Sequence, residues 1–526
     1  SFPFLTISDT VTATLTIGDG STISATTGDL TIASNVNTQA TLGFLGVNGL
    51  GFSLSVAKNE FTETVSNKVK LGKNVKLRAQ NGTMTVHANN KHKGDMAGYN
   101  ITANALNLTD VLTSYNHGAF TAEVSIGTGF NAAGRVLTLE ALNTEEFLSN
   151  GKKVTFSLVL NPYSKNGIDV KDTSTATITL EGGVIDVAKF NAKALTDVSV
   201  KATQLIGGGS ITVDVNIGKV KSDVTQTSAI TLGTDGNALD VLTDDISITA
   251  HNKHYFDRLD SGSKSIIFGG DVGLVSGTSK GTVDAKQTLN ATVTLGSGSK
   301  IRRRADAAHY LTKDEHTALV SATNNVDSDT EISLTAASLL NANCILTTWD
   351  QTTASATLNL NGSIDTWGDT ELTAYSHARH NMINSVTSGS IFPTFHTHLK
   401  NTIDTNDAVN ISGAVESIGN ITIQSGSAKG KYKLVDGTTV LAGDDDTNAT
   451  HYFWGKDEAV IYNKRRESVT INADVRAGGE LSIYNDSSAN TVKQPFHQTH
   501  ESDDFRNAAI DTAADVTSTI SIGGDA

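Results

Sequence analysis

The stretch Leu15-Thr16-Ile17-Gly18-Asp19-Gly20, with Asp29-Leu30-Thr31-Ile32-Ala33 a few residues later, is the unit on which the whole chain is built. Alternating β-branched residues favour a strand, and the glycines that follow favour a turn. The same pair returns as Ile230-Thr231-Leu232-Gly233, followed by Ile246-Ser247-Ile248-Thr249-Ala250. The unit is therefore strand, glycine turn, strand.

This unit recurs at a nearly constant interval along the 526 residues. We call the last apolar residue of each first strand the anchor residue. The anchor residues are Ile17, Leu71, Ile126, Leu180, Leu232, Leu295, Leu360, Ile411, Ile471 and Ile522. Successive anchors lie 54, 55, 54, 52, 63, 65, 51, 60 and 51 residues apart. A repeat of this length that carries strands is typical of a solenoid or an array.

The composition favours a parallel β-helix over an array of sandwich domains. Only 4 residues are proline, which a chain of hydrogen-bonded strands should avoid. A sandwich domain needs about 100 residues and an aromatic core, whereas this unit is half as long and aromatic residues make up 6%. We expect one all-β, continuous β-solenoid over 1–526, with about nine repeats of 50–65 residues and the anchors stacked in its core. At about 5 residues per strand, each repeat would form roughly two coils.

Two repeats are longer than the others, and the surplus predicts larger loop insertions near 296–331 and 425–468. Surplus length in a solenoid goes to loops on one side, often the working side. The first segment contains Arg302-Arg303-Arg304, and the second contains Asp444-Asp445-Asp446. The three aspartates suggest Ca²⁺ binding, but no calcium-loop spacing surrounds them, so a solvated acidic loop is the favoured interpretation.

Asparagine is also periodic. Asn35, Asn90, Asn143 and Asn252 stand two residues after the alanine that ends the second strand of their repeats. Stacked asparagines form hydrogen-bonded ladders in stacked strands. We therefore predict such a ladder, with chance in an Asn-rich chain as the alternative.

Charge and motifs exclude several classes of function. The net charge is −15, which argues against a nucleic-acid partner because phosphate binding needs a basic face. No apolar run approaches the ~20 residues that cross a bilayer. A nucleophile elbow, a P-loop and a dinucleotide fingerprint are absent from the sequence. The one cysteine, Cys344, stands in an apolar setting and is interpreted as a core residue. We expect no enzyme activity and no cofactor.

Two groups of residues suggest binding. Trp349, Trp367 and Trp454, with Tyr452 and Phe453, could together form a carbohydrate or receptor patch. Loops packing onto the solenoid are the favoured alternative. His396-Thr397-His398 places two imidazoles on one face of a strand, as two ligands of a Zn²⁺ or Cu²⁺ site would lie. No third ligand is evident nearby, so exposed loop histidines without metal are expected.

The order of strands and glycine turns in the repeat also resembles that of a known family. The residues that carry the resemblance are Gly28-Asp29-Leu30-Thr31-Ile32-Ala33, Asp245-Ile246-Ser247-Ile248-Thr249-Ala250 and Ala291-Thr292-Val293-Thr294-Leu295-Gly296-Ser297-Gly298. They resemble the repeat regions of giant exported bacterial adhesins of the leukotoxin and filamentous-haemagglutinin kind, and the resemblance covers most of the chain as a cadence. It implies a right-handed parallel β-helix, export across two membranes, and a role in attachment or surface structure. It supplies no catalytic motif.

Two classes of function follow as expectations. The first is an exported structural or adhesive protein, extracellular or on a bacterial cell surface, which binds its own copies head-to-tail or the glycans of a host or neighbouring cell. The alternative is a secreted carbohydrate-active β-helix enzyme or spike that acts on polysaccharide. An enzyme should gather Asp, Glu, Arg and aromatic side chains in one lateral groove. A fibre should show mostly Thr, Ser and Asn outward.

The sequence predicts that both ends of the chain are strands without polar caps. Phe4, Leu5 and Ile7 begin it, and Ile520 and Ile522 end it. An open coil presents unpaired backbone groups and apolar side chains. Either the chain continues in a longer protein, or these five residues mediate head-to-tail assembly into a filament, which is the favoured hypothesis.

Overall fold

The computed structural model describes residues 4–49, 52–234, 236–256, 267–273, 275–304, 316–390, 392–426, 431–433, 439–441, 450–451, 455–485, 497–498 and 506–523. Within these ranges the chain consists of strands, bends and turns, with no helix. Two large sheets contain nearly all of the strands.

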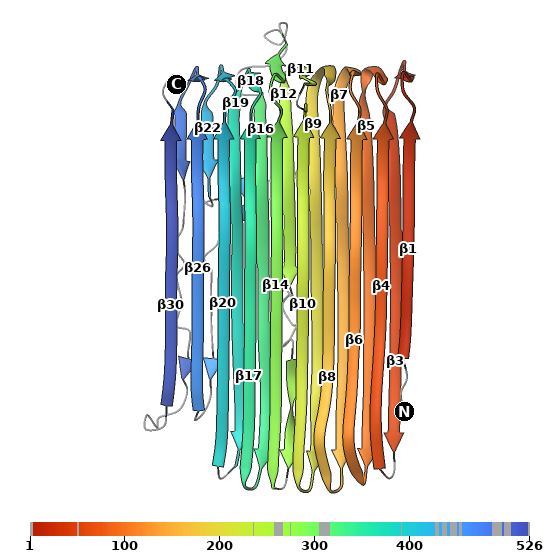
Figure 1. Ribbon diagram of the computed structural model, residues 1–526, viewed down its shortest axis with the longest axis vertical. Coiled ribbons are helices and arrows are strands. Elements are labelled where there is room, and N and C mark those ends of the chain that lie inside the picture. Colours follow the sequence, from red (N-terminus) through yellow and green to blue (C-terminus); the bar gives the residue numbers. More distant parts are fainter. Residues whose placement is uncertain are drawn as a thin grey trace.

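The first sheet has ten parallel strands that lie side by side in sequence order, as Figure 1 shows from red to blue. They are β1(Phe4–Ile17), β4(Phe52–Leu71), β6(Leu106–Ile126), β8(Leu160–Leu180), β10(Val213–Leu232), β14(Ser276–Leu295), β17(Asn341–Leu360), β20(Phe392–Ile411), β26(Gly455–Ile471) and β30(Arg506–Ile522). All the pairings are parallel, and each strand ends on an anchor residue.

The second sheet has sixteen strands and contains the return path of each coil. Most coils contribute a short strand, a bend and then a second strand. The short strands are β2(Thr22–Ala25), β11(Leu239–Thr243), β15(Lys300–Arg303), β18(Ser363–Thr366), β21(Val415–Ser417) and β27(Val475–Ala477). The second strands are β3(Leu30–Gly49), β12(Asp245–Phe256), β13(Ile267–Gly273), β16(Thr317–Ser338), β19(Asp369–Gly389), β22(Ile421–Ser425) and β28(Leu481–Asn485). In β5(Lys76–Asn104), β7(Phe130–Ser157) and β9(Gly183–Ser210) both parts form one strand.

Two small sheets lie outside this plan. β23(Lys431–Lys433) and β24(Thr439–Leu441) pair antiparallel, and β25(Thr450–His451) pairs parallel with β29(His497–Gln498).

The anchor residues stack on one another residue for residue. Ile17 pairs with Leu71, and Leu232 pairs with Leu180 on one side and Leu295 on the other. The spacing of anchors in the sequence is thus the register of the sheet. Ile126, Leu180 and Leu232 are fully buried, as predicted for stacked core residues. The architecture is solenoid-like, with one repeat stacked on the next.

The prediction of two coils of short strands per repeat is wrong. Each repeat makes one coil, from a strand of about 20 residues in each sheet, such as β14 and β3. The distal ends of these strands contain apolar residues spaced by glycines, as in 42–47 of β3 and 205–209 of β9. Alternation continues through these glycines because no proline interrupts the ladder.

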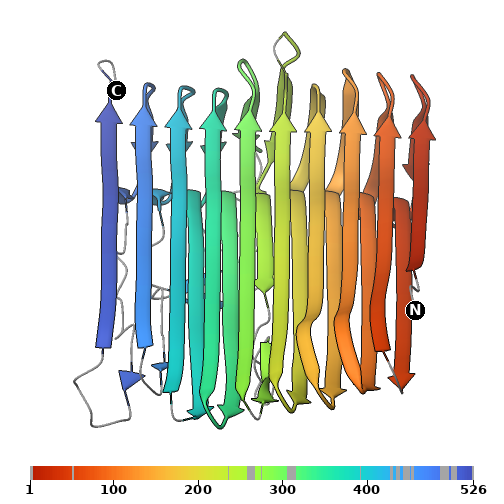
Figure 2. The ribbon, with the colours of Figure 1, turned by 60° about the horizontal axis from the view of Figure 1, so that its bottom comes forward.

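Each coil therefore has two turns. The anchor turn follows the anchor residue and lies at the top of Figure 1; the distal turn joins the second sheet back to the first, at the bottom of Figures 1 and 2. Several anchor turns need a left-handed residue, with φ of 69° at Gly20 and 72° at Gly129. A main core cluster of buried Val, Ile, Leu and Ala fills the space between the sheets next to the anchor turns.

The predicted asparagine ladder is present with three of its four predicted members, Asn90, Asn143 and Asn252. Asn90 Nδ2 donates to Asn143 Oδ1 at 2.8 Å, and Asn252 Nδ2 donates to Asn324 Oδ1 at 2.7 Å. Thr196 also donates to Asn252, and Asn324 donates to Ser376. Asn35 lies outside the ladder, because Val36 is the residue paired with Asn90. A shift of one residue places a side chain on the opposite face of a strand.

Parts of the two segments expected as insertions belong to strands of the two large sheets. In 296–331, β15 and β16 account for 300–303 and 317–331, and residues 305–315 lie outside the described residues. In 425–468, β26 begins at Gly455. Asp444-Asp445-Asp446 lie outside the described residues.

The distal turns have an unusual surface, which we call the distal edge. Its apolar side chains are between 42% and 69% exposed. They are Leu45, Val47, Leu54, Ile101, Leu108, Phe156, Leu158, Val159, Ile211, Val272, Val275, Leu339 and Leu340. Each lies within four residues of the end of a strand at a distal turn.

Candidate functional site in the groove beside the anchor turns

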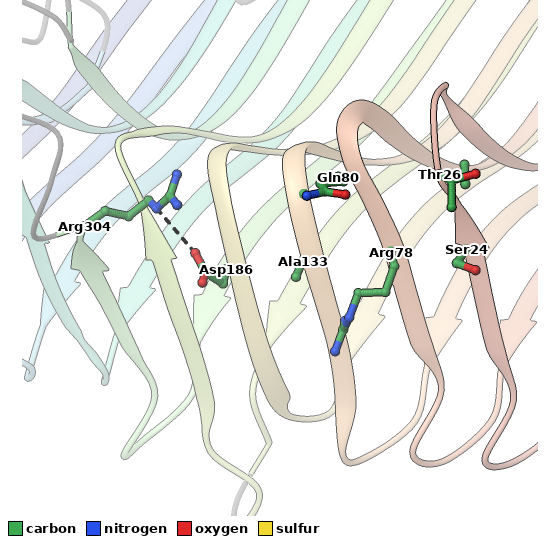
Figure 3. A pocket seen from close by; sticks show the side chains of 9 residues that line it. Ser24, Thr26, Arg78, Gln80, Ala133, Asp186 and Arg304 are labelled. Carbon is green, nitrogen blue, oxygen red and sulfur yellow. Dashed lines mark ion pairs between the residues drawn. The ribbon is translucent and has the colours of Figure 1, made fainter. Parts of the chain in front are cut away.

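A groove runs across several coils where the second sheet bends between its short and long segments. Its volume is about 370 Å³. It is lined by Ser24, Ala25, Thr26, Arg78, Gln80, Ala133, Gly134, Asp186 and Arg304. Figure 3 shows these side chains projecting from successive rungs, with Arg78 and Arg304 on different coils. A ligand in this groove would run along the stack and contact several coils.

Small residues form the centre of the groove. Ala133 and Gly134 lie at the bend of β7, where the register of β5 against β7 shifts between Ala79 and Thr83. A Cβ at Gly134 would lie 2.5 Å from the carbonyl oxygen of Ala79. Any larger residue would force the two rungs apart, so the close approach of the coils requires glycine here.

Two arginines give the groove its charge. Arg78 Nη1 donates to the carbonyl oxygens of Leu77 and Asn131, at 2.9 and 3.2 Å. Arg304 Nε lies 3.3 Å from Asp186 Oδ1, the ion pair drawn in Figure 3. Arg304 Nη1 also lies 3.9 Å from Asp244. A guanidinium at this kind of site can bind a carboxylate or phosphate of a ligand through two parallel hydrogen bonds.

Arg302 and Arg303, which precede Arg304, also form ion pairs. Arg302 forms two parallel hydrogen bonds with Asp240. Nε donates to Oδ1 at 3.0 Å, and Nη2 donates to Oδ2. Arg303 Nε lies 3.4 Å from Asp365. The three arginines therefore have partners on three neighbouring rungs.

Trp367 lies at this end of the groove, between β18 and β19. The Arg303 guanidinium lies 5.1 Å from the centre of its ring, and its Nε1 donates to the Arg304 carbonyl at 3.2 Å. The indole is half-buried and its ring is in cation–π contact. The contact joins β15 to the bend that follows β18.

Burial changes the acidity of two carboxyl groups here. It raises the pKa of Asp244 above its ordinary value, with Arg304 opposing the change. It also raises the pKa of Asp365, opposed by Arg303. Both carboxyl groups pair with arginines next to the groove, and carboxyl groups with raised pKa values are candidates for proton transfer.

The predicted aromatic patch is not assembled by the described residues. Trp349 lies on the outer face of the first sheet, in β17, and is 38% exposed. Trp367 lies at the bend of the second sheet. Tyr452, Phe453 and Trp454 lie outside the described residues. Sequence proximity could not show that Trp367 meets Arg303, because the two belong to different coils.

The histidine pair lies on a strand, not in a loop. His396 and His398 belong to β20, and His398 Nδ1 lies 3.3 Å from Glu458. Trp349 packs edge-on against His398, with ring centres 6.3 Å apart. Among the described residues, no group of three or more His, Cys, Asp or Glu side chains is placed to hold a metal ion.

Cys344 is buried, as predicted. Its side chain is fully inaccessible between the sheets, and burial raises the pKa of the thiol to about 12. A thiol with this pKa is unreactive at neutral pH.

A second surface, the threonine patch, lies on the outer face of the first sheet. It consists of sixteen outward positions on β8, β10, β14 and β17, of which twelve are threonine and none is ionisable. They are Thr173, Thr175, Thr177, Thr179, Thr225, Thr227, Ala229, Thr231, Thr288, Asn290, Thr292, Thr294, Thr353, Ser355, Thr357 and Asn359. The register aligns them in rows across the strands. The alternating threonines beside each anchor are the signal in the sequence for this patch.

The five predicted assembly residues lie on the two outermost strands of the first sheet. Phe4, Leu5 and Ile7 in β1 are 63%, 39% and 40% exposed. Ile520 and Ile522 in β30 are 47% and 58% exposed. Within the described residues, β1 pairs with β4 and β30 pairs with β26.

Comparison of the chain with protein-family models, curated proteins and solved structures gives no match. The described part of the chain has no helix long and apolar enough to cross a membrane.

Proposed function

We propose that this chain is the rod of an exported surface protein with a structural or adhesive role, built as a right-handed parallel β-solenoid. The observation that carries the proposal is the residue-for-residue register of all ten long strands, which repeats the same outward positions from coil to coil. A surface that repeats in this way can bind a repetitive partner at many points at once, which raises avidity.

The outer face of the first sheet supports an adhesive role. The threonine patch carries short hydroxyl and amide side chains and no charge, although the chain has a net charge of −15. Uncharged hydrogen-bonding groups suit an uncharged partner such as a neutral glycan. The patch also matches the Thr, Ser and Asn surface expected of a fibre.

End-to-end stacking is the proposed mode of fibre assembly. Phe4, Leu5 and Ile7 on β1, and Ile520 and Ile522 on β30, would pack against an adjoining coil. That coil could belong to the same longer chain or to another copy. Backbone pairing across such a junction would continue the parallel ladder.

Adhesion and assembly can be tested separately. Beads coated with the chain should adhere to cells or to a neutral-glycan array, and Thr177→Lys with Thr292→Lys should reduce adhesion at least tenfold. Electron microscopy of the chain should show filaments, and deletion of residues 1–9 should abolish them. Adhesion unchanged by the double substitution would overturn the adhesive role of the patch. Filaments unchanged by the deletion would overturn end-to-end stacking through β1.

The groove carries a second candidate function, carbohydrate recognition or cleavage. The specific observation is the contact of Trp367 with Arg303, beside Asp365 and close to Arg304 and Asp244. Turnover of any polysaccharide from a panel, lost in Asp244→Asn or Asp365→Asn, would establish an enzyme and contradict the purely structural proposal. Binding without turnover, weakened by Trp367→Ala, would assign the groove as a saccharide-binding site.

A further inference from the structure

The distal edge is an exposed apolar ridge. Leu45, Leu108, Phe156, Leu158 and Leu339 on it are 50% to 69% exposed. A cavity of about 450 Å³ opens among the distal turns after β5, β7 and β9, and its lining includes Phe156, Leu158 and Ile211. Contiguous exposed apolar surface of this kind marks a site of contact with a protein or a membrane.

The ridge is continuous because the distal turns are hydrogen-bonded to one another. Val159 N donates to the carbonyl of Ala105 at 3.2 Å, and Thr212 N donates to the carbonyl of Val159 at 3.1 Å. Asn341 N then donates to the carbonyl of Val275 at 3.2 Å. Apolar side chains on successive coils are therefore held in a line.

Charge is excluded from the distal turns of successive coils. No charged residue occurs in 41–57, 96–109, 154–164, 202–213 or 332–349. Five separate turns avoid charge in a chain with 95 charged residues. Near the turn between β13 and β14, Asp271 in β13 is buried and 1% exposed, so its carboxylate is not on the surface of the edge.

Near the distal edge, β5, β6 and β7 have polar side chains inside and apolar side chains outside. Inside, Asp110 accepts hydrogen bonds from Asn100 at 2.7 Å and Thr102 at 2.9 Å. Outside, Leu108 and Phe156 face away from this network. Burial of the apolar side chains would require a partner outside the chain.

A border of lysines follows the apolar edge on the first sheet. Lys165 and Lys280 flank Ile217 in one outward row, and the next row contains Lys58 and Lys219. On the second sheet Lys152 lies over Tyr99, with Nζ 5.4 Å from the ring centre. On β4, β8 and β14 the first outward carboxylates, Glu60, Asp169 and Asp284, occur one outward row further from the edge, and Glu60 Oε2 lies 2.7 Å from Lys58 Nζ. On β26, Glu458 lies in the same row as Lys219 and pairs with His398 at 3.3 Å.

We propose that the distal edge inserts into the interface of an anionic lipid bilayer. The apolar side chains would enter the acyl region and the bordering lysines would contact anionic headgroups, as on interfacial segments that lie in a membrane surface. Long lysine stems allow the ammonium groups to reach headgroups while their methylenes remain on apolar surface. The rod would then lie along the membrane with its anchor turns pointing away.

A second copy of the chain fits this edge less well. Two copies joined edge to edge would bring their lysine borders together, and like charges in contact oppose association. An anionic headgroup layer complements the same border.

Co-sedimentation with vesicles tests the proposal. The chain should bind vesicles of phosphatidylcholine with 30% phosphatidylglycerol and bind pure phosphatidylcholine at least tenfold more weakly, since the anionic surface attracts each lysine. Leu158→Asp should weaken binding about tenfold or more. Lys165→Gln with Lys280→Gln should weaken it about twenty-five-fold, at about fivefold per lysine. Ser125→Asp, on the outer face of β6 near the anchor turn, should leave it unchanged.

Leu158 and Lys165 are on the surface, so circular dichroism and thermal unfolding should show folded variants. Equal binding to both vesicle types, no binding to either, or binding unaffected by Leu158→Asp would overturn the proposal. A lipid-free dimer that Leu158→Asp dissociates, without vesicle binding, would assign the edge to a second copy and also overturn it.

Discussion

In the coils of β5 to β8 the anchor half and the distal half are made from the same strands but have opposite arrangements of polar and apolar side chains. Near the anchor turn of β6, Val124 and Ile126 are buried and Ser125 faces outward. Near the distal turn, Asp110 is buried and Leu108 is exposed. Alternation makes two faces of a strand different, but it does not decide which face lies inside.

The difference shows two ways to fill the space between the sheets. The anchor half is filled with Val, Ile, Leu and Ala, which gain by leaving water. In the coils of β5 to β8 the distal half is filled with polar side chains that need hydrogen-bond partners. Asn107 donates to Asn161 at 2.7 Å, and Lys153 contacts Asp110. The first half is stable by itself, whereas the second depends on complete pairing. In the coils of β13 to β17 a second apolar cluster, which includes Ile267, Ile332 and Leu346, occupies the distal interior.

The largest effect should follow from placing a charge in the anchor half. Ile248 is 1% exposed, so Ile248→Asp buries a carboxylate without a partner and should lower the free energy of unfolding by about 5 kcal/mol or more. Urea unfolding and resistance to protease measure the loss. The matched control is Ile217→Asp, on the outer face of the distal half between Lys165 and Lys280, which should change stability by less than about 1 kcal/mol. Equal effects at the two sites would contradict the assigned core.

Breaking an ion pair in the distal half should be nearly as costly. Lys153 Nζ lies 3.5 Å from Asp110 Oδ1 and 3.2 Å from the Lys165 carbonyl. Lys153→Met leaves the Asp110 carboxylate without its cation and should cost about 3 to 5 kcal/mol. The double substitution Lys153→Met with Asp110→Asn should recover more than half of the loss in urea unfolding. Strictly additive losses would show that the two groups are not coupled.

Rising pH should reduce stability at the distal turn that joins β13 to β14. Burial and the neighbouring Asp214 raise the pKa of Asp271, and burial also raises the pKa of Asp214. Because the folded pKa values exceed the unfolded value of about 4, these groups contribute full stability below pH 4 and lose it as pH rises toward the folded values.

Hydrogen exchange corrected for its intrinsic pH dependence should therefore show residues 206–217 losing protection between pH 5 and pH 9. Asp271→Asn should reduce that loss. If the protection of residues 206–217 falls equally with pH in the variant, other groups cause the loss.

The smallest effect concerns the asparagine ladder, which separates the apolar core from the polar interior. Asn143 Nδ2 donates to the Thr175 carbonyl at 2.8 Å and to Ser174 Oγ at 3.2 Å. Asn143→Ala should cost about 1 to 3 kcal/mol in thermal or urea unfolding. Asn150→Ala, on the outer face of the same strand, is the control and should be near neutral. A neutral Asn143→Ala would mean that the ladder adds no stability.

Much of the first sheet could be predicted from the sequence. The spacings of 54, 55, 54, 52 and 63 residues from Ile17 to Leu295 reappear as the pairings of β1, β4, β6, β8, β10 and β14. In a parallel stack each residue pairs with its equivalent one coil later, so an interval measured along the chain is also a register. The burial of Cys344 and the stacking of Asn90 on Asn143 follow from the same alternation.

The candidate groove was less predictable. Arg303 and Trp367 are 64 residues apart in the sequence (367 − 303) and meet because β15 and β18 are neighbouring rungs. The sequence indicated an arginine-rich insertion and scattered tryptophans, but contact between them depends on where each rung bends.

The sequence by itself thus determined the repeat, the strand alternation and the register of the anchors, because these depend on the local period of the strands and on one constant interval. Tertiary structure alone decided that one repeat makes one coil, which arginine meets which carboxylate, and which face lies inside near the distal turns. Those features depend on how the two sheets close around a shared interior, where Asp110 finds Asn100 and Lys153 while Leu108 is left on the surface.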